Sequence, residues 1–273
     1  MAASAADPYG RFMTSILSAR AVRKVYRTGA QPVEALRGID LDVAEGDLVA
    51  VMGPSGNGKT TLLNCLSGLD DIDEGTVHID GVDLHRLSDA RRTAHRAARM
   101  GFVFQAFNLV PVLSARENVE LPLLVNGVRP RAARKRALAM LDRVGLADRA
   151  GHRPSELSGG EQQRVAIVRA LVTAPAIVWA DEPTGNLDSQ TAGSVLEVLH
   201  EAHRAGQTLV LVTHDRTIGA TGTRLVQVRD GRITYDGSPA VLGVDPQRVA
   251  NGTLAVDPLT GSAAGHGGEA ALR

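Results

Sequence analysis

The chain has 273 residues, with 30 lysines and arginines against 30 aspartates and glutamates, so its net charge is zero. This length allows one sizeable core, and the balanced charge gives no sign of a nucleic-acid-binding protein. The single cysteine, Cys65, excludes an internal disulfide.

No apolar run reaches the ~18 residues that a bilayer-crossing helix needs, and the longest run covers residues 170–180. The N-terminus lacks the basic and apolar segments of a signal peptide. We therefore expect a cytoplasmic protein. If it works at a membrane, a partner must recruit it there.

The first part of the chain predicts strands. Residues 1–15 are small and polar, and we expect them to be disordered. Residues 16–26 and 76–79 read as strands, and apolar side chains alternate with polar ones through 39–43. These segments favour an antiparallel sheet beside the central core.

Residues 53–61 form a phosphate loop. They fit the pattern G-x-x-x-x-G-K-[ST], with Lys59 and Thr60 at its end, after the apolar run 48–52 and before a helical pattern. Glycines let backbone N–H groups curl toward phosphate oxygens, and the following helix adds its positive end. We expect Lys59 to reach the β- and γ-phosphates and the Thr60 hydroxyl to ligate Mg²⁺.

The middle of the chain turns helical. Residues 88–99 predict a basic helix and 100–104 a buried strand, after which 115–125 and 131–144 read as helices inserted between core strands. Basic residues of this insertion could face a membrane or nucleic acid, but a solvated helix face is the commoner role. They are Arg129, Arg131, Arg134, Lys135 and Arg136.

The remaining segments alternate between strand and helix. Ser158 is a good cap for a helix running to about residue 173, and 176–180 predict a strand that ends in Asp181 and Glu182. A helix over 190–205 and a strand over 208–212 follow, the latter leading to His214. Residues 224–228 and 232–235 flank a hairpin turn, and we expect 238–273 to be irregular or disordered.

Alternating strands and helices predict a parallel sheet with helices on both faces, whose ligands bind at the carboxyl ends of the strands. The phosphate loop, Gln105, Asp181 with Glu182, and His214 all follow predicted strands directly. We therefore expect them to share one site. There Asp181 would hold Mg²⁺, Glu182 would deprotonate an attacking water, and His214 would bond the γ-phosphate.

The segment 157–164, Leu-Ser-Gly-Gly-Glu-Gln-Gln-Arg, carries a resemblance to the ATP-binding subunits of ATP-binding cassette (ABC) transporters. It matches the signature segment of that family, and the likeness runs from about residue 16 to 237. The resemblance implies the ABC-type phosphate-loop NTPase fold over 16–237. That fold has a mainly parallel core sheet, an antiparallel β subdomain and a helical subdomain at about 106–160.

The resemblance also implies site residues. Tyr26 stands where the family stacks an aromatic ring on adenine, Gln105 at the Q-loop, where it helps to hold Mg²⁺ and sense the γ-phosphate, and Asp188 in the D-loop. The implied catalytic residues are Glu182, His214, Gln105 and Lys59, and the implied metal ligands are Thr60, Gln105 and Asp181. The implied ATP-binding residues are Tyr26, Gly53, Pro54, Ser55, Gly56, Asn57, Gly58, Lys59, Thr60, Thr61, Ser158, Gly159, Gly160 and Asp188.

The signature segment would form a second anion site, because Ser158, Gly159 and Gly160 stand at a helix N-terminus. Cassettes of this family pair head to tail, so that each ATP lies between one phosphate loop and the other signature segment. The chain carries one set of motifs, which favours a homodimer with two ATP sites.

The D-loop form Gly185-Asn186-Leu187-Asp188 resembles the lipoprotein-releasing and macrolide-export subgroup. This implies an ATPase that drives a separate membrane permease, outward, from the cytoplasmic face. A regulatory cassette that signals through a membrane partner without transport stays open. A DNA- or ribosome-acting cassette is disfavoured, since the chain has neither a long coiled coil nor a second cassette.

Overall fold

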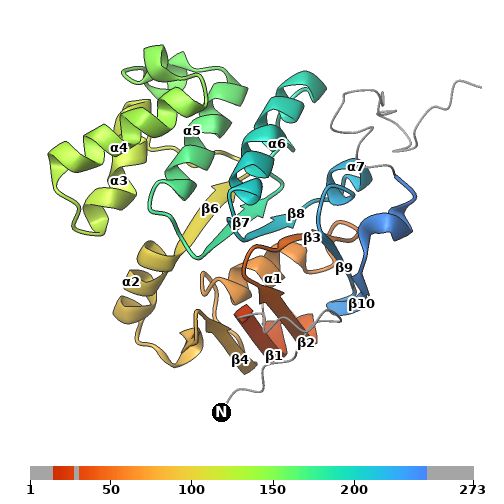
Figure 1. The fold of residues 1–273 in the computed structure, drawn as a ribbon. Coiled ribbons are helices and arrows are strands. Elements are labelled where there is room, and N and C mark those ends of the chain that lie inside the picture. The colour runs from red at the N-terminus through yellow and green to blue at the C-terminus, as the bar shows by residue number, and fades with distance from the viewer. Residues whose placement is uncertain (1–14, 28–30, 245–273) are drawn as a thin grey trace, which may run out of the picture.

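A sheet of six strands runs through the protein, whose structure, a computed structural model, describes residues 15–27 and 31–244 (Figure 1). The strands follow the order β10-β9-β3-β8-β7-β6. All neighbouring pairs are parallel except β9 and β10. The prediction of a mainly parallel core sheet is confirmed. The strands are β3 (Leu48–Met52), β6 (Met100–Phe104), β7 (Ile177–Asp181), β8 (Leu209–Val212), β9 (Arg224–Arg229) and β10 (Arg232–Gly237).

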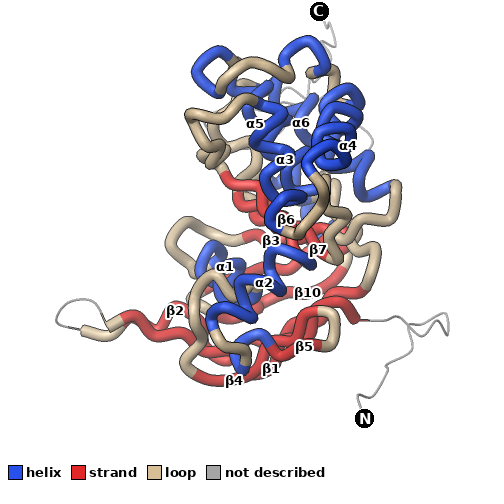
Figure 2. The backbone as a smooth tube through the Cα atoms, turned by 90° about the vertical axis from the view of Figure 1, so that its left-hand side faces the viewer, coloured by secondary structure: helices blue, strands red, loops and turns tan. Residues whose placement is uncertain are grey.

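A second sheet is antiparallel and lies beside the first, as predicted (Figure 2). Its order is β2-β1-β4-β5, with β1 (Ser15–Tyr26), β2 (Val33–Ala44), β4 (Glu74–Ile79) and β5 (Val82–Asp83). β2 begins well before the alternating run that predicted it, because its first residues pair with the end of β1. β5 is too short to give a periodic signal.

Helices cover both faces of the central sheet, and every residue of β3 is buried. On one face Val49 and Val51 pack with Leu62 of α1 (Lys59–Leu66) and with the antiparallel sheet. On the other face Leu48 packs with α5 (Gly159–Leu171), α6 (Ser189–Arg204) and α7 (Arg216–Gly219). Cys65 lies on the buried side of α1, where burial raises the pKa of its thiol to about 12.

The helical insertion has a core of its own. α3 (Ala115–Val125) and α4 (Pro130–Arg143) pack on α5 through Val119, Leu141 and Val165, at the end of the molecule remote from the antiparallel sheet (Figure 2). The two helices predicted here are confirmed. The basic helix predicted before β6 is α2 (Asp89–Arg99).

The described chain continues past the expected boundary at residue 237. Pro239–Leu242 form a short 3₁₀-helix, and Leu242 is buried against Ala50 and Leu225. An apolar side chain in reach of the core orders this stretch, which the high Gly and Pro content of the region concealed. Ser15 already belongs to β1, and the rest of the expected irregular or disordered residues, 1–14 and 245–273, lie outside the described residues.

Candidate functional site

The phosphate loop connects the end of β3 to the start of α1. Within it the Lys59 ammonium donates hydrogen bonds to the carbonyls of Gly53, at 2.8 Å, and Pro54, at 3.0 Å, so the loop curls around a positive charge. A side chain at Gly53 would come within 2.1 Å of the Val228 carbonyl. Gly58 has φ 92° and precedes α1 without any side-chain cap. The first N–H groups of α1 are therefore left for another acceptor.

The acidic and histidine side chains meet at the carboxyl ends of the parallel strands. The Thr60 hydroxyl lies 3.4 Å from Asp181 Oδ1, and His214 Nδ1 lies 2.9 Å from Glu182 Oε1. Glu182 has a left-handed backbone, with φ 47°, and its N–H donates to the Val212 carbonyl at the end of β8. Strained backbone of this kind is common at functional sites. It turns the Glu182 side chain toward His214.

The pair Thr60 and Asp181 suits a hard cation. Burial raises the pKa of Asp181, and the Thr60 hydroxyl bond partly opposes this. Within residues 15–27 and 31–244 no cluster of three or more His, Cys, Asp or Glu could hold a metal alone. Mg²⁺ commonly takes only one or two protein ligands and completes its shell with phosphates and water. Facing hydroxyl and carboxylate oxygens therefore fit Mg²⁺ beside a bound phosphate.

Tyr26 and the phosphate loop border one cavity of about 570 Å³. The Tyr26 hydroxyl donates to Asp70 at 2.7 Å, and the Lys24 ammonium lies 5.1 Å from the ring centroid. Val33, which is exposed, borders the cavity beside Tyr26. The ring is thus fixed at the rim of a cavity that also contains Lys59 and Thr60.

Gln105 follows β6 and is held by the D-loop. Its side-chain amide donates to Asn186 Oδ1 at 3.1 Å, and the Asn186 amide donates to the Gln105 carbonyl at 3.0 Å. A side chain at Gly185 would meet the Gln105 amide at 2.8 Å. Sequence reasoning placed Gln105 at the site but missed its partner, because an asparagine in a loop carries no signal of what it contacts.

The signature segment begins α5. The Ser158 hydroxyl accepts a bond from the Glu161 N–H, and the Glu161 carboxylate accepts one from the Ser158 N–H. A side chain at Gly160 would come within 2.1 Å of Thr191, so α5 approaches α6 closely here. Asp188 caps α6 by accepting bonds from the N–H groups of Gln190 and Thr191. Its bonds to Thr191 hold the pKa of Asp188 below its usual range.

Residues 36–185 match the ABC transporter family. A relative from Thermotoga maritima, named an uncharacterized ABC transporter ATP-binding protein, is 48% identical over 221 residues, which cover 81% of this chain and 94% of the relative. The chain belongs to the ABC transporter family. Because the ATP-binding domains of this family are ATPases, the chain is an ABC ATPase cassette that binds ATP.

Two further similarities are to a full-length transporter protein and to a solved cassette. The macrolide export ATP-binding/permease protein MacB of Nitrosomonas europaea is 45% identical over 222 residues, which cover 81% of this chain but only 34% of MacB. The chain thus spans about a third of MacB. A solved dimer of the ATP-binding cassette MJ0796, in a post-hydrolysis state with ADP and Pi, superposes with a TM-score of 0.75 at 41% identity, over 82% of this chain and 98% of that one.

One contact of the ABC phosphate loop was not foreseen. The Asn57 side chain accepts a bond from the Asp230 N–H at 2.8 Å, which ties the loop to the turn between β9 and β10. Both turn residues have positive φ, 49° at Asp230 and 71° at Gly231, as the predicted hairpin requires. The tie joins positions far apart in the chain, so no local pattern could reveal it.

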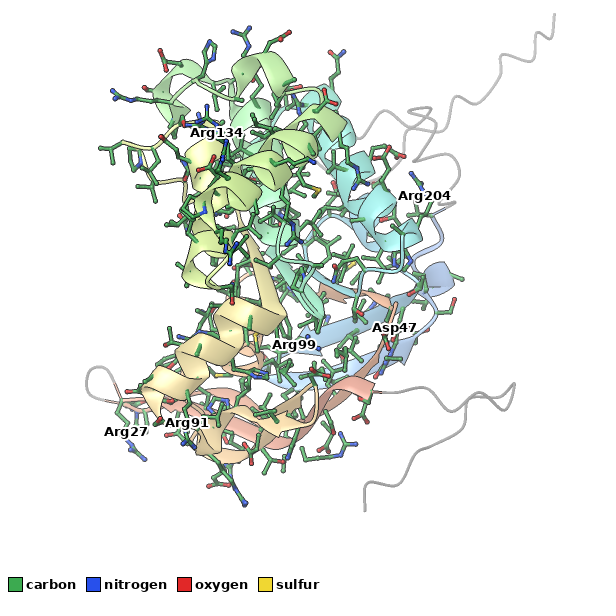
Figure 3. The ribbon with its side chains drawn as sticks, turned by 60° about the vertical axis from the view of Figure 1, so that its left-hand side comes forward. Arg27, Asp47, Arg91, Arg99, Arg134 and Arg204 are labelled. Carbon is green, nitrogen blue, oxygen red and sulfur yellow. The ribbon has the colours of Figure 1, made fainter. Side chains whose placement is uncertain are left out.

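The basic face of the helical insertion is exposed, which fits both a solvated helix face and a face that meets a membrane or nucleic acid. Arg131, Arg134 and Lys135 all lie on the outside of α4, and Figure 3 shows Arg134 at the opposite end of the molecule from Arg27 and Arg91. In the part of the chain that the structure describes, no helix is both long and apolar enough to cross a membrane.

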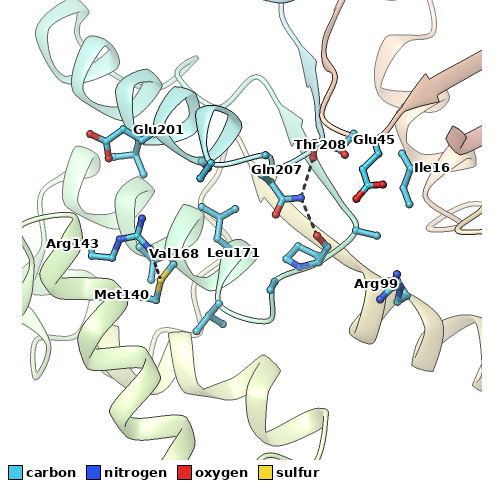
Figure 4. A pocket seen from close by; sticks show the side chains of 18 of the residues that line it. Ile16, Glu45, Arg99, Met140, Arg143, Val168, Leu171, Glu201, Gln207 and Thr208 are labelled. Carbon is cyan, nitrogen blue, oxygen red and sulfur yellow. Dashed lines mark hydrogen bonds between the residues drawn. The ribbon is translucent and has the colours of Figure 1, made fainter. Parts of the chain in front are cut away.

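A larger cavity, of about 1020 Å³, opens beside α4 and α6 (Figure 4). Its walls include Arg143, Leu171 and Gln207, whose amide donates to the carbonyls of Pro175 and Thr208. None of the residues proposed to bind ATP borders it. The larger cavity is therefore separate from the nucleotide site.

Proposed function

We propose that the chain hydrolyses Mg²⁺-ATP between two copies of itself and thereby drives a separate membrane permease. The observation that carries this proposal is the meeting of Thr60 with Asp181, and of Glu182 with His214, next to the phosphate loop. Each pair joins residues from separate segments of the chain at one edge of the central sheet. Such convergence supports a catalytic site rather than a glycine-rich turn.

The phosphate loop would bind the triphosphate. The N–H groups of residues 53–61 and the Lys59 ammonium would face the phosphates, and Tyr26, which borders the same cavity, would stack on the adenine. Thr60, Asp181 and Gln105 would hold Mg²⁺, which when bound neutralises phosphate charge. In this assignment the predicted binding residues Pro54, Ser55, Gly56 and Thr61 would surround the phosphates as part of the loop.

Glu182 would take the proton from the attacking water. A general base must lie within hydrogen-bond reach of the proton it abstracts, and the hydrogen bond of 2.9 Å that His214 Nδ1 donates to Glu182 Oε1 orients the carboxylate. In its doubly protonated form, His214 would also donate to the γ-phosphate through Nε2. Together the two side chains place base and phosphate donor side by side.

The second half of each site would come from a partner copy. Ser158, Gly159 and Gly160 stand at the start of α5, which in its own chain packs against Thr191 and so lies beside the D-loop. The dimeric MJ0796 cassette supports a dimer of this chain. Asp188, whose carboxylate is used as a cap, would stand at the same interface.

The permease and the direction of transport rest on relatives. MacB joins an ATP-binding part and a permease in one protein and is named for macrolide export. This likeness supports an exporter or lipoprotein-releasing partner for the present cassette, which would bind it at the cytoplasmic face of the membrane. A regulatory cassette that signals without transport is the second candidate, and the same likeness is compatible with it.

The first test is Glu182→Gln. Removing a general base should lower kcat by about 10²–10⁴-fold, while the phosphate loop keeps its affinity for ATP. In the presence of ATP the variant should then accumulate as a dimer, which light scattering would detect. Hydrolysis near the wild-type rate would eliminate Glu182 as the base.

The same Glu182→Gln variant tests the partner. With ATP it should retain, in detergent extracts of membranes, a permease with few membrane spans and a large extracytoplasmic domain. Transport by that permease, reconstituted with wild-type cassette, separates the transporter from the regulatory candidate. Absence of any membrane protein would contradict both.

A further inference from the structure

Two consecutive residues shortly after Gln105 have backbone conformations that side chains rarely adopt. Phe107 has φ 61° and Asn108 has φ 50°. The left-handed region is disfavoured by roughly tenfold for most residues other than glycine, including Phe107, although asparagine adopts it more readily. Such conformations persist only where neighbouring structure holds them. The segment after Gln105 therefore needs an external contact.

Arg169 on α5 supplies that contact. Its Nη2 donates to the Phe107 carbonyl at 2.9 Å and its Nη1 to the Asn108 carbonyl at 2.5 Å. The planar guanidinium presents its N–H donors in a fixed geometry, one to each oxygen, whereas a lysine ammonium is a point charge on a flexible stem. Burial lowers the pKa of Arg169, and no described carboxylate offsets this. A partly buried charge is therefore kept for bonds to two carbonyls.

A second side chain of α5 holds the other side of Gln105. Gln163 is fully buried, and its amide donates to the carbonyl of Phe104 at 3.4 Å and of Pro183 at 2.5 Å. Phe104 directly precedes Gln105, and Pro183 directly follows Glu182. The helix that begins at the signature segment thus grips the chain before and after Gln105.

We propose that Arg169 is a positioning residue for ATP hydrolysis. By binding the carbonyls of Phe107 and Asn108 together, it fixes Gln105 relative to α5. Any movement of α5 is then passed to Gln105, and the first turn of α5 is where the partner's ATP would bind. The proposal rests on the role of Gln105 in the proposed function.

Arg169→Met removes the hydrogen bonds to the carbonyls of Phe107 and Asn108, and Arg136→Met is the matched control. Arg136 also donates to a main-chain carbonyl, that of Val172 at 3.3 Å, but has no contact with the Gln105 segment. We expect Arg169→Met to lower kcat at least about tenfold, since small displacements at a reacting centre have large effects. ATP affinity should stay within about twofold of wild type, because α5 does not border the Tyr26 cavity. Arg136→Met should leave both quantities unchanged.

A double-mutant cycle separates positioning from general stability. If Arg169 acts through Gln105, then Arg169→Met should cause no further loss of kcat in a Gln105→Ala background. Losses that multiply would overturn the proposal, as would a folded Arg169→Met protein with wild-type kcat. If Arg169→Met fails to fold, Arg169→Lys keeps the charge and enters the same cycle. Normal turnover of Gln105→Ala alone would instead refute the proposed role of Gln105.

Discussion

The helices α1 and α5 both begin with glycine-rich segments, yet their N-termini are built differently. α1 follows Gly58, has no side-chain cap, and has no acidic residue in its first turn. α5 is capped by Ser158 in a complete capping box with Glu161. An uncapped N-terminus leaves N–H donors free for phosphate, whereas a capped one has already used some of them.

The difference implies unequal roles for the two proposed anion sites. The bond from the Ser158 N–H lowers the pKa of Glu161 and keeps that side chain charged, close to where a phosphate would approach. Arg149, whose Nε lies 3.5 Å from the Glu161 carboxylate, and Arg164 partly offset the charge. We infer that α1 supplies most of the affinity for ATP, and that α5 adds a weaker contact once two chains meet.

The largest expected effect is complementation between the two N-termini. The Lys59→Ala and Ser158→Arg proteins should each be inactive alone, since every site that either could form lacks one half. In a mixture, heterodimers carry one site with both lesions and one with an intact Lys59 and an intact Ser158. ATPase activity should return in the mixture, up to the activity of about one intact site in each heterodimer. Phosphate release from mixed and separate proteins measures it.

Strict cooperation between the two sites could suppress the returning activity. Light scattering on the same mixture supplies the control, since ATP should still produce dimers that neither variant forms alone. Full activity of a wild-type protein that stays monomeric at every ATP concentration would contradict the two-chain site.

Local signals predicted most of the fold. The apolar run before the phosphate loop became β3, the Ser158 cap became the start of α5, and the turn at Asp230 joined a hairpin, as expected. In each case the pattern of neighbouring residues fixes the conformation. Leu242 was missed because its ordering depends on a core contact with Leu225, which lies far away in the sequence.

The candidate site was predicted unevenly for the same reason. Residues directly after strands, such as Gln105 and Asp181, were found because parallel strands end at one edge of a sheet. The partners that orient them, such as Asn186 and Arg169, were not found. Those contacts join separate segments, and the positive φ of Phe107 and Asn108 has no counterpart in the residue types.

Substitutions of Tyr26 should change the affinity for ATP at the α1 site and leave the α5 contact unaffected. Base–aromatic stacking contributes about 1–3 kcal/mol, so Tyr26→Ala should weaken ATP binding roughly 5- to 150-fold. Tyr26→Phe keeps the ring but loses the bond to Asp70, and should change affinity little. Calorimetric titration of ATP into the monomeric protein measures the affinity of both variants. Equal affinities for all three proteins would remove Tyr26 from the site.

The smallest effect belongs to Glu161 and bears directly on the capped N-terminus. Glu161→Gln keeps a side-chain oxygen for the Ser158 N–H but removes the negative charge. Two like charges about 4 Å apart in water repel by about 1 kcal/mol, and by less when farther apart, so ATP-driven dimerisation should strengthen by up to about fivefold. Loss of the long contact with Arg149 should cost little, since exposed ion pairs contribute little. Analytical ultracentrifugation across a series of ATP concentrations measures the ATP concentration at which half of the protein is dimeric.

Glu161→Ala separates charge from capping. It also removes the charge but breaks the bond to Ser158, so the first turn of α5 should fray and the gain in dimerisation should be smaller than for Glu161→Gln. Because salt screens exposed charges, the advantage of Glu161→Gln over wild type should shrink at high ionic strength. ATP binding to the monomer should not change in either variant, because that step uses α1. If Glu161→Gln and wild type dimerise at the same ATP concentration in low salt, then the carboxylate does not weaken the α5 site, and the two N-termini differ in capping alone.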